Sequence, residues 1–189
     1  MSTLPTVTGN SFLAVDLSAD ERHELAAALH AASPGPRIPG RRAKPQNWHV
    51  TLRFLGPIDD LTRDLLLAEV EQTLDVAPAH VRISGLGAFP RPSKATVMYA
   101  SVVDPGAALD ALAAQCEDAC REIGLEPEER PFVPHVTLAR IRPPRDVRRL
   151  IEAFGEFSVR IAVNSVSLMR ADHAGGDLRY VCDAEFPLS

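Results

Sequence analysis

The chain has 189 residues, of which 46% are apolar, and its 20 basic and 25 acidic side chains give a net charge of −5. This composition excludes a disordered chain, and no stretch approaches the 18 uninterrupted apolar residues that indicate a membrane span. The negative charge argues against a broad nucleic-acid-coating surface, but not against a local basic site for one phosphate or one RNA end. We therefore expect a single globular domain over 1–189.

The predicted elements of the first half alternate between strands and helices. A short apolar strand over 11–17 leads into a capping box, in which Ser18 and Glu21 begin a helix that ends near Ala32. A loop rich in proline and glycine over 34–40 ends in the basic residues Arg41, Arg42 and Lys44. The remaining elements are a strand over 48–55, a helix over 61–74 and two strands over 80–89 and 95–103.

The second half repeats this order. Asp104 and Pro105 favour a helix start and Gly124 its end, with an apolar stripe that includes Cys116 and Cys120. A strand is expected over 133–140, and a short helix introduced by Pro143 and Pro144 ends at Gly155. Three strands follow, over 157–163, 166–170 and 178–185, the last two joined around Gly175 and Gly176.

Weak duplication of this kind, in half-plans of about 11–103 and 104–186, predicts an α+β fold with two similar lobes. Each lobe would be an antiparallel sheet with helices on its outer side, and a pseudo-twofold axis would relate the lobes around a central cleft.

Cysteine usage indicates the compartment. Three cysteines are an odd number and too few for a disulfide framework, and the amino-terminal residues lack the basic and apolar regions of a secretory signal. We therefore expect a reduced, cytoplasmic protein. Cys116 and Cys120 are four residues apart on an apolar stripe without two further ligands, so we interpret them as buried thiols rather than metal ligands.

Two identical tetrapeptides, His-Val-Thr-Leu, carry the candidate chemistry at residues 49–52 and 135–138. In a strand, side chains alternate between faces, so each histidine shares a face with the threonine two residues on, while valine and leucine pack inward. If His49 and Thr51 face His135 and Thr137, the four groups suit a tetrahedral phosphate. Two imidazoles can act as base and acid on opposite sides of phosphorus, and the hydroxyls can donate to its non-bridging oxygens.

With their flanking residues these motifs resemble the 2H phosphoesterase superfamily, which carries paired His-x-Thr motifs. The blocks Asn-Trp-His-Val-Thr-Leu-Arg-Phe-Leu-Gly at 47–56 and Arg-Pro-Phe-Val-Pro-His-Val-Thr-Leu-Ala-Arg at 130–140 are most similar to the RNA 2′,3′-cyclic phosphodiesterases, once described as 2′–5′ RNA ligases. The resemblance implies an enzyme that opens RNA or oligonucleotide 2′,3′-cyclic phosphate ends to 2′-phosphomonoesters. It also implies no cofactor and no metal.

By this resemblance His49 is the proton donor and His135 the proton acceptor, with Thr51 and Thr137 as substrate-binding residues. It also places Arg140, three residues after Thr137, at the phosphate. Strand alternation favours Arg53 instead, because Arg53 shares the face of His49 whereas Arg140 is out of phase with His135. A strand end or a β-bulge would be needed to bring Arg140 in, and we rank Arg140 above Arg53 on resemblance.

Other functions remain open at this point. One is an ATP-independent 2′–5′ RNA ligase, since the sequence contains no phosphate-binding P-loop pattern. Another is a nucleotide-binding module that kept the cleft and lost catalysis. The presence of both intact His-x-Thr motifs argues against this alternative. His49 and His135 could also be metal ligands, but no suitably spaced third ligand lies near them. The expected partner is an RNA end bearing a 2′,3′-cyclic phosphate. We expect the protein to be a monomer that does not bind a membrane.

Overall fold

The computed structural model describes residues 9–33, 35, 38–173 and 176–189. The amino-terminal segment, the expected loop residues Pro34 and Pro36, and Gly175 of the expected final turn lie outside these ranges. Within them the helices are α1 (Ala19–Ala32), α2 (Asp60–Thr73), α3 (Ala108–Glu122) and α4 (Arg148–Ala153). None of these helices has the length and apolar character required to cross a membrane.

Nine strands of the described residues form one sheet. They are β1 (Asn10–Asp16), β2 (Arg41–Arg42), β3 (His49–Pro57), β4 (Ala79–Phe89), β5 (Ala95–Val103), β6 (His135–Arg145), β7 (Val159–Val163), β8 (Ser165–Asp172) and β9 (Arg179–Pro187). The order is β7-β4-β5-β6-β3-β1-β8-β9, with β2 added to β6, and every pairing is antiparallel.

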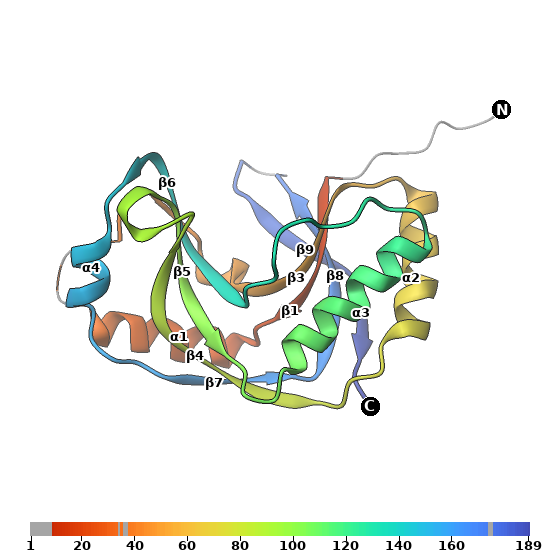
Figure 1. Cartoon of the computed structure of the whole chain (residues 1–189), viewed down its shortest axis with the longest axis horizontal. Helices are drawn as coiled ribbons and strands as arrows, with labels where there is room; N and C mark the ends of the chain where they lie inside the picture. Colours follow the sequence, from red (N-terminus) through yellow and green to blue (C-terminus); the bar gives the residue numbers. More distant parts are fainter. Residues whose placement is uncertain (1–8, 34, 36–37, 174–175) are drawn as a thin grey trace.

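The sheet has two similar halves that meet between β3 and β6, as the predicted two-lobed α+β fold requires (Figure 1). Outward from this junction one half contains β3, β1, β8 and β9, and the other contains β6, β5, β4 and β7. Each half therefore combines two strands from before residue 104 with two strands from after it. The half-plans of 11–103 and 104–186 remain a prediction about the sequence pattern.

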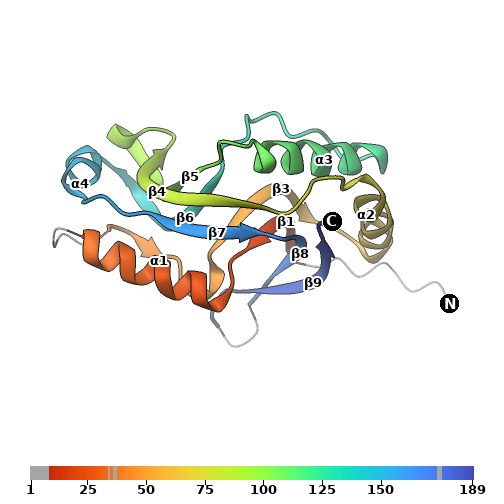
Figure 2. The ribbon, with the colours of Figure 1, turned by 90° about the horizontal axis from the view of Figure 1, so that it is seen from below.

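The helices lie at opposite ends of this arrangement. Figures 1 and 2 show α1 and α4 toward the left end of the molecule, and α2 and α3 toward the right end. The capping box is present, because Glu21 N–H donates to Ser18 Oγ and Ser18 N–H donates to Glu21. The second oxygen of the same Glu21 carboxylate accepts from Ala162 N–H of β7 at 2.7 Å. One residue thus both begins α1 and attaches it to the sheet.

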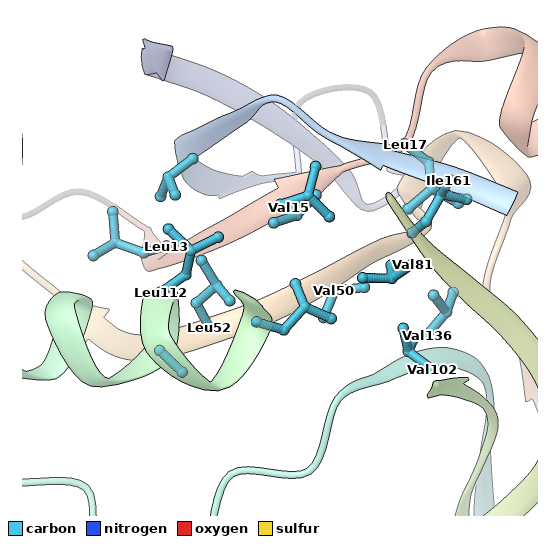
Figure 3. Close-up of a cluster of buried hydrophobic side chains, with 14 of the residues drawn as sticks. Leu13, Val15, Leu17, Val50, Leu52, Val81, Val102, Leu112, Val136 and Ile161 are labelled. Carbon is cyan, nitrogen blue, oxygen red and sulfur yellow. The ribbon is translucent and has the colours of Figure 1, made fainter. Parts of the chain in front are cut away.

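The core fills the space between α3 and the central strands. Figure 3 shows Leu13 of β1, Val50 and Leu52 of β3 and Leu112 of α3 gathered in one cluster. Cys116 and Cys120 are buried free thiols on the same helix, which confirms their interpretation as core residues. After α3 the chain reverses at Gly124, whose φ of 84° lies in the left-handed region that glycine adopts without strain.

Two short segments differ from expectation. Arg41 and Arg42, expected in a loop, form β2, because β6 extends far enough to offer a free edge there. Pro143 and Pro144 do not begin a helix, since β6 continues through them to Arg145 and α4 starts only at Arg148. Local propensity indicates a break at these prolines, but the terminal part of a strand tolerates residues that cannot donate to a ladder.

Candidate active site

The two His-Val-Thr-Leu motifs meet at the centre of the sheet. Strands β3 and β6 pair in the antiparallel register that sets Val50 opposite Val136, and both valines are fully buried. The neighbours of each valine therefore project from the other face of the sheet. In this register His49 lies on the side of Thr137, and His135 lies on the side of Thr51. The four predicted side chains thus share one face, on opposite sides of the junction between the lobes.

Backbone carbonyls fix the orientation of both imidazole rings. His49 Nδ1 lies 2.8 Å from Asn47 O, and His135 Nδ1 lies 2.6 Å from Val133 O. A carbonyl oxygen only accepts hydrogen bonds, so each Nδ1 carries a hydrogen and donates it. In the neutral ring each Nε2 is then the basic nitrogen. His49 Nε2 is 3.0 Å from Thr51 Oγ1, which can donate to it.

Each histidine packs against one phenylalanine and one tyrosine. His49 stacks on Phe12 with ring centroids 4.6 Å apart and meets the edge of Tyr180 at 5.1 Å. His135 contacts Phe89 at 5.0 Å and Tyr99 at 5.1 Å. These rings desolvate the imidazoles and restrict their rotation. The sequence alone does not reveal this paired arrangement, because the four aromatic residues come from four different strands.

A glycine makes room for one of these rings. Gly87 is the cross-strand partner of Tyr99, and a Cβ atom added at Gly87 would lie 2.3 Å from the tyrosine ring. Any other residue would displace Tyr99 from its position over β4 and against His135. The absence of a side chain at Gly87 therefore supports the orientation of His135.

Burial makes both histidines weak bases in the free protein. Desolvation is the largest effect on His49 and lowers its pKa to about 4, with smaller contributions from the positive charges of His135, Arg22 and Arg140. The pKa of His135 is also lowered, first by desolvation and then by Arg140. The carbonyl hydrogen bonds act in the opposite direction in both cases. His49 is therefore neutral at pH 7 until a negative charge arrives beside it.

This shift predicts a pH dependence of stability. The unfolded His49 has a pKa of about 6.5 and the folded one about 4, so the unfolded chain binds more protons between these values. The contribution of His49 is complete above pH 6.5 and decreases as the pH falls toward 4. Between pH 7 and 4.5 we expect the free energy of unfolding to decrease by about 2 kcal/mol more in the wild type than in His49→Asn.

Urea unfolding of both proteins at the two pH values provides the measurement. His80→Asn is the matched control, because His80 is an exposed strand histidine and should retain the wild-type dependence. An unchanged pH dependence in His49→Asn would contradict the assignment.

A β-bulge in β6 decides the position of Arg140. Thr137 is opposite Tyr99 and Ala139 is opposite Met98, so Leu138 is an extra residue without a partner on β5. Leu138 and Ala139 are both buried in consequence. The alternation shifts by one, and Arg140, opposite Val97, projects from the face of Thr137 and His135. The bulge required by the sequence argument is therefore present.

A corresponding bulge in β3 moves Arg53 to the opposite face. Thr51 is opposite Ala14 and Arg53 is opposite Leu13, which leaves Leu52 without a partner on β1. Arg53 is only 8% exposed, and its guanidinium donates to Glu117 of α3 and to the carbonyl oxygens of Phe54 and Glu126. The expectation that Arg53 shares the face of His49 is wrong, because simple alternation does not hold across the bulge.

Phe54 takes the place in the first motif that Arg140 has in the second. It is the cross-strand partner of Phe12, the residue stacked on His49, and it is 45% exposed. The sequence contained the signal for this residue, since Phe54 and Arg140 are each five positions after the motif histidine. The match is meaningful only once both bulges are known.

Trp48 belongs to the core instead. It is 6% exposed and packs in the main hydrophobic cluster, as its position one residue before His49 predicts.

Within the described residues, no group of three or more histidine, cysteine, aspartate or glutamate side chains is arranged to hold a metal ion.

Comparison with known proteins places this chain in a family. Residues 24–175 match the 2′-5′ RNA ligase superfamily. A protein of Methanothermobacter thermautotrophicus named RNA 2′,3′-cyclic phosphodiesterase is 31% identical over 170 residues, which cover 86% of this chain and 89% of that protein. A protein of Aeropyrum pernix with the same name is 31% identical over 137 residues, covering 70% and 76%.

Solved structures show the same fold. The crystal structure of Escherichia coli LigT complexed with 3′-AMP superimposes with a TM-score of 0.77 at 23% identity, covering 97% of this chain and 99% of LigT.

Proposed function

The chain belongs to the 2′-5′ RNA ligase superfamily, and from this premise we propose that it hydrolyses 2′,3′-cyclic phosphate ends of RNA or oligonucleotides to 2′-phosphomonoesters. One observation carries the proposal: two carbonyl-oriented imidazoles lie on one face of the two central strands, each with a threonine two residues on. The relatives are named phosphodiesterases, which favours hydrolysis over ligation.

Each histidine has one role in the proposed reaction. His135 accepts a proton from water at Nε2, and the water oxygen forms a bond to phosphorus. The bond from phosphorus to the 3′ oxygen breaks, and His49 gives its Nε2 proton to that oxygen. The product is a 2′-phosphomonoester with a free 3′ hydroxyl. The reaction leaves His135 protonated and His49 neutral, and proton exchange with solvent restores the starting states.

The depressed pKa of His49 makes its role dependent on substrate. In the free protein the ring is neutral at pH 7, because burial disfavours the imidazolium. The cyclic phosphate carries one negative charge, and an anion beside the ring favours its protonated form. We infer that substrate binding charges His49 and so prepares the acid. In this scheme the proton donor is in place only when a phosphate is present to use it.

Hydrogen-bond donors on the same face would hold the phosphate. Thr51 and Thr137 offer hydroxyl groups, and Arg140 offers a guanidinium without a carboxylate partner among the described residues. Three donors are enough for the two non-bridging oxygens of a cyclic phosphodiester. The exposed ring of Phe54 is suitably placed to stack a nucleobase. We expect the enzyme to act as a cytoplasmic monomer on such RNA ends.

Phosphorus NMR of guanosine 2′,3′-cyclic phosphate incubated with the protein tests this function directly. The expected result is loss of the cyclic resonance and growth of a single 2′-phosphomonoester resonance. Formation of the 3′-phosphomonoester would reverse which oxygen leaves, and no reaction on any cyclic phosphate end would refute the proposal.

Metal independence is a separate prediction. The proposed steps use two imidazoles, two hydroxyls and a guanidinium, so dialysis against EDTA should leave the hydrolysis rate unchanged. The measurement is the rate before dialysis, after it, and after adding Mg²⁺, Mn²⁺ or Zn²⁺. Activity that EDTA abolishes and a divalent ion restores would show that His49 and His135 act as ligands, and their acid and base roles would have to be withdrawn.

A further inference from the structure

The two-residue strand β2 places a second arginine beside Arg140. In the antiparallel pairing of β2 with β6, Arg41 is opposite Arg140 and Arg42 is opposite Ala139. Directly opposed residues project from the same face of a sheet, with Cα atoms about 5 Å apart. Because the bulge turns Arg140 toward the face of His135, Arg41 projects from that face too. Arg42 belongs to the other face.

The electrostatics of Tyr180 support this placement. Burial raises the pKa of Tyr180, and the charges of Arg140 and Arg41 act against this shift. Tyr180 is the ring whose edge meets His49 at 5.1 Å. Both guanidinium groups are therefore close enough to the candidate active site to affect one of its aromatic residues.

Neither arginine is neutralised by the protein within its described residues. Other arginines form ion pairs, including Arg53 with Glu117 and Arg170 with Asp183, whereas among the described residues no carboxylate is paired with the guanidinium of Arg41 or Arg140. Lys44 donates a hydrogen bond to the Asp177 carboxylate at 2.6 Å and is the main cause of its lowered pKa, to which the charge of Arg41 contributes less. Two adjacent unpaired cations repel each other, so this surface favours a ligand with more than one negative charge.

The cyclic phosphate alone does not use both charges. It has two non-bridging oxygens and one negative charge, and in the function proposed above Thr51, Thr137 and Arg140 already supply its donors. Arg41 is then left beside the reacting group with a free charge. In a nucleic acid the next negative group is the phosphodiester on the 5′ side of the terminal nucleotide.

We propose that Arg41 binds this adjacent phosphodiester and makes the enzyme selective for oligonucleotide ends over cyclic mononucleotides. The inference rests on the proposed function, because it takes the position of the cyclic phosphate from it. Arg41 contributes to binding and selectivity and takes no part in the proton transfers.

The experiment compares adenosine 2′,3′-cyclic phosphate with the dinucleotide ApA that ends in the same cyclic phosphate. The wild type should have the higher kcat/KM on the dinucleotide. Arg41→Gln should reduce this selectivity ratio about tenfold, the effect of losing one charge-assisted contact. It should also reduce the slope of log kcat/KM against log salt for the dinucleotide by about 0.7. Arg42→Gln is the matched control and should preserve both quantities.

A ratio unchanged by Arg41→Gln would overturn the proposal, whether both substrates lose activity equally or neither does. An equal loss would place Arg41 at the cyclic phosphate itself. Calorimetry with ApA 2′-phosphate and adenosine 2′-phosphate measures the contribution of Arg41 to binding the second phosphate independently of catalysis. If the wild type hydrolyses neither substrate, the proposed function fails, yet weaker binding of the dinucleotide alone by Arg41→Gln would still support the second phosphate site.

Discussion

Replacing either active-site histidine with asparagine lowers kcat by about 10²–10⁴-fold, the usual range for one general acid or base. Asparagine suits this test because its amide can still donate to the carbonyl of Asn47 or Val133, while it cannot exchange a proton as Nε2 does. The double substitution should cost less than the product of the single effects, because one proton donor without its acceptor already fails to complete the reaction.

Steady-state hydrolysis of the dinucleotide ApA with a terminal 2′,3′-cyclic phosphate measures these effects, with His80→Asn as the control on an exposed strand histidine. The wild-type rate should be bell-shaped in pH, with two apparent pKa values that belong to the coupled pair. Single variants that retain near wild-type turnover would exclude the two-histidine mechanism. A single variant that unfolds, detected by circular dichroism, would be replaced by glutamine at the same position.

Substitution of Arg53 should reduce stability, whereas substitution of Arg140 should reduce catalytic efficiency. Arg53→Met removes the donors that satisfy Glu117 and two carbonyl oxygens in a largely buried setting, so we expect a loss of about 2–4 kcal/mol in the free energy of unfolding. Arg140→Gln removes an exposed guanidinium from the active-site face, so we expect wild-type stability and a 10- to 100-fold lower kcat/KM.

Urea unfolding and steady-state kinetics on both variants separate these outcomes. Arg63→Met is the control for stability, because Arg63 forms exposed ion pairs with Asp60 and Asp64 on α2 and should change stability by less than about 1 kcal/mol. If folded Arg53→Met were the more impaired enzyme and Arg140→Gln the less stable protein, the two bulges would not turn these side chains as described.

Local sequence was sufficient for most elements. The capping box at Ser18 and Glu21 predicts the start of α1, the glycine at 124 predicts the end of α3, and alternation predicts β5 with its observed bounds. In each case the pattern lies within a few residues of the chain, although β5 is held by pairing with β4 and β6. The repeated His-Val-Thr-Leu motif likewise predicts two strands and the burial of Val50 and Val136, without their pairing.

Long-range pairing decided the rest. The bulges at Leu52 and Leu138 exist only relative to the neighbouring strands β1 and β5, so alternation along a single strand could not show that Arg53 turns inward and Arg140 outward. Strand β2 depends on the exposed edge of β6 in the same way, and it brings Arg41 beside Arg140 across 99 residues. Local sequence specifies which chemical groups are present and in which strands they lie. The tertiary structure decided which of them share a face, because an extra residue opposite a partner strand reverses the alternation from that point onward.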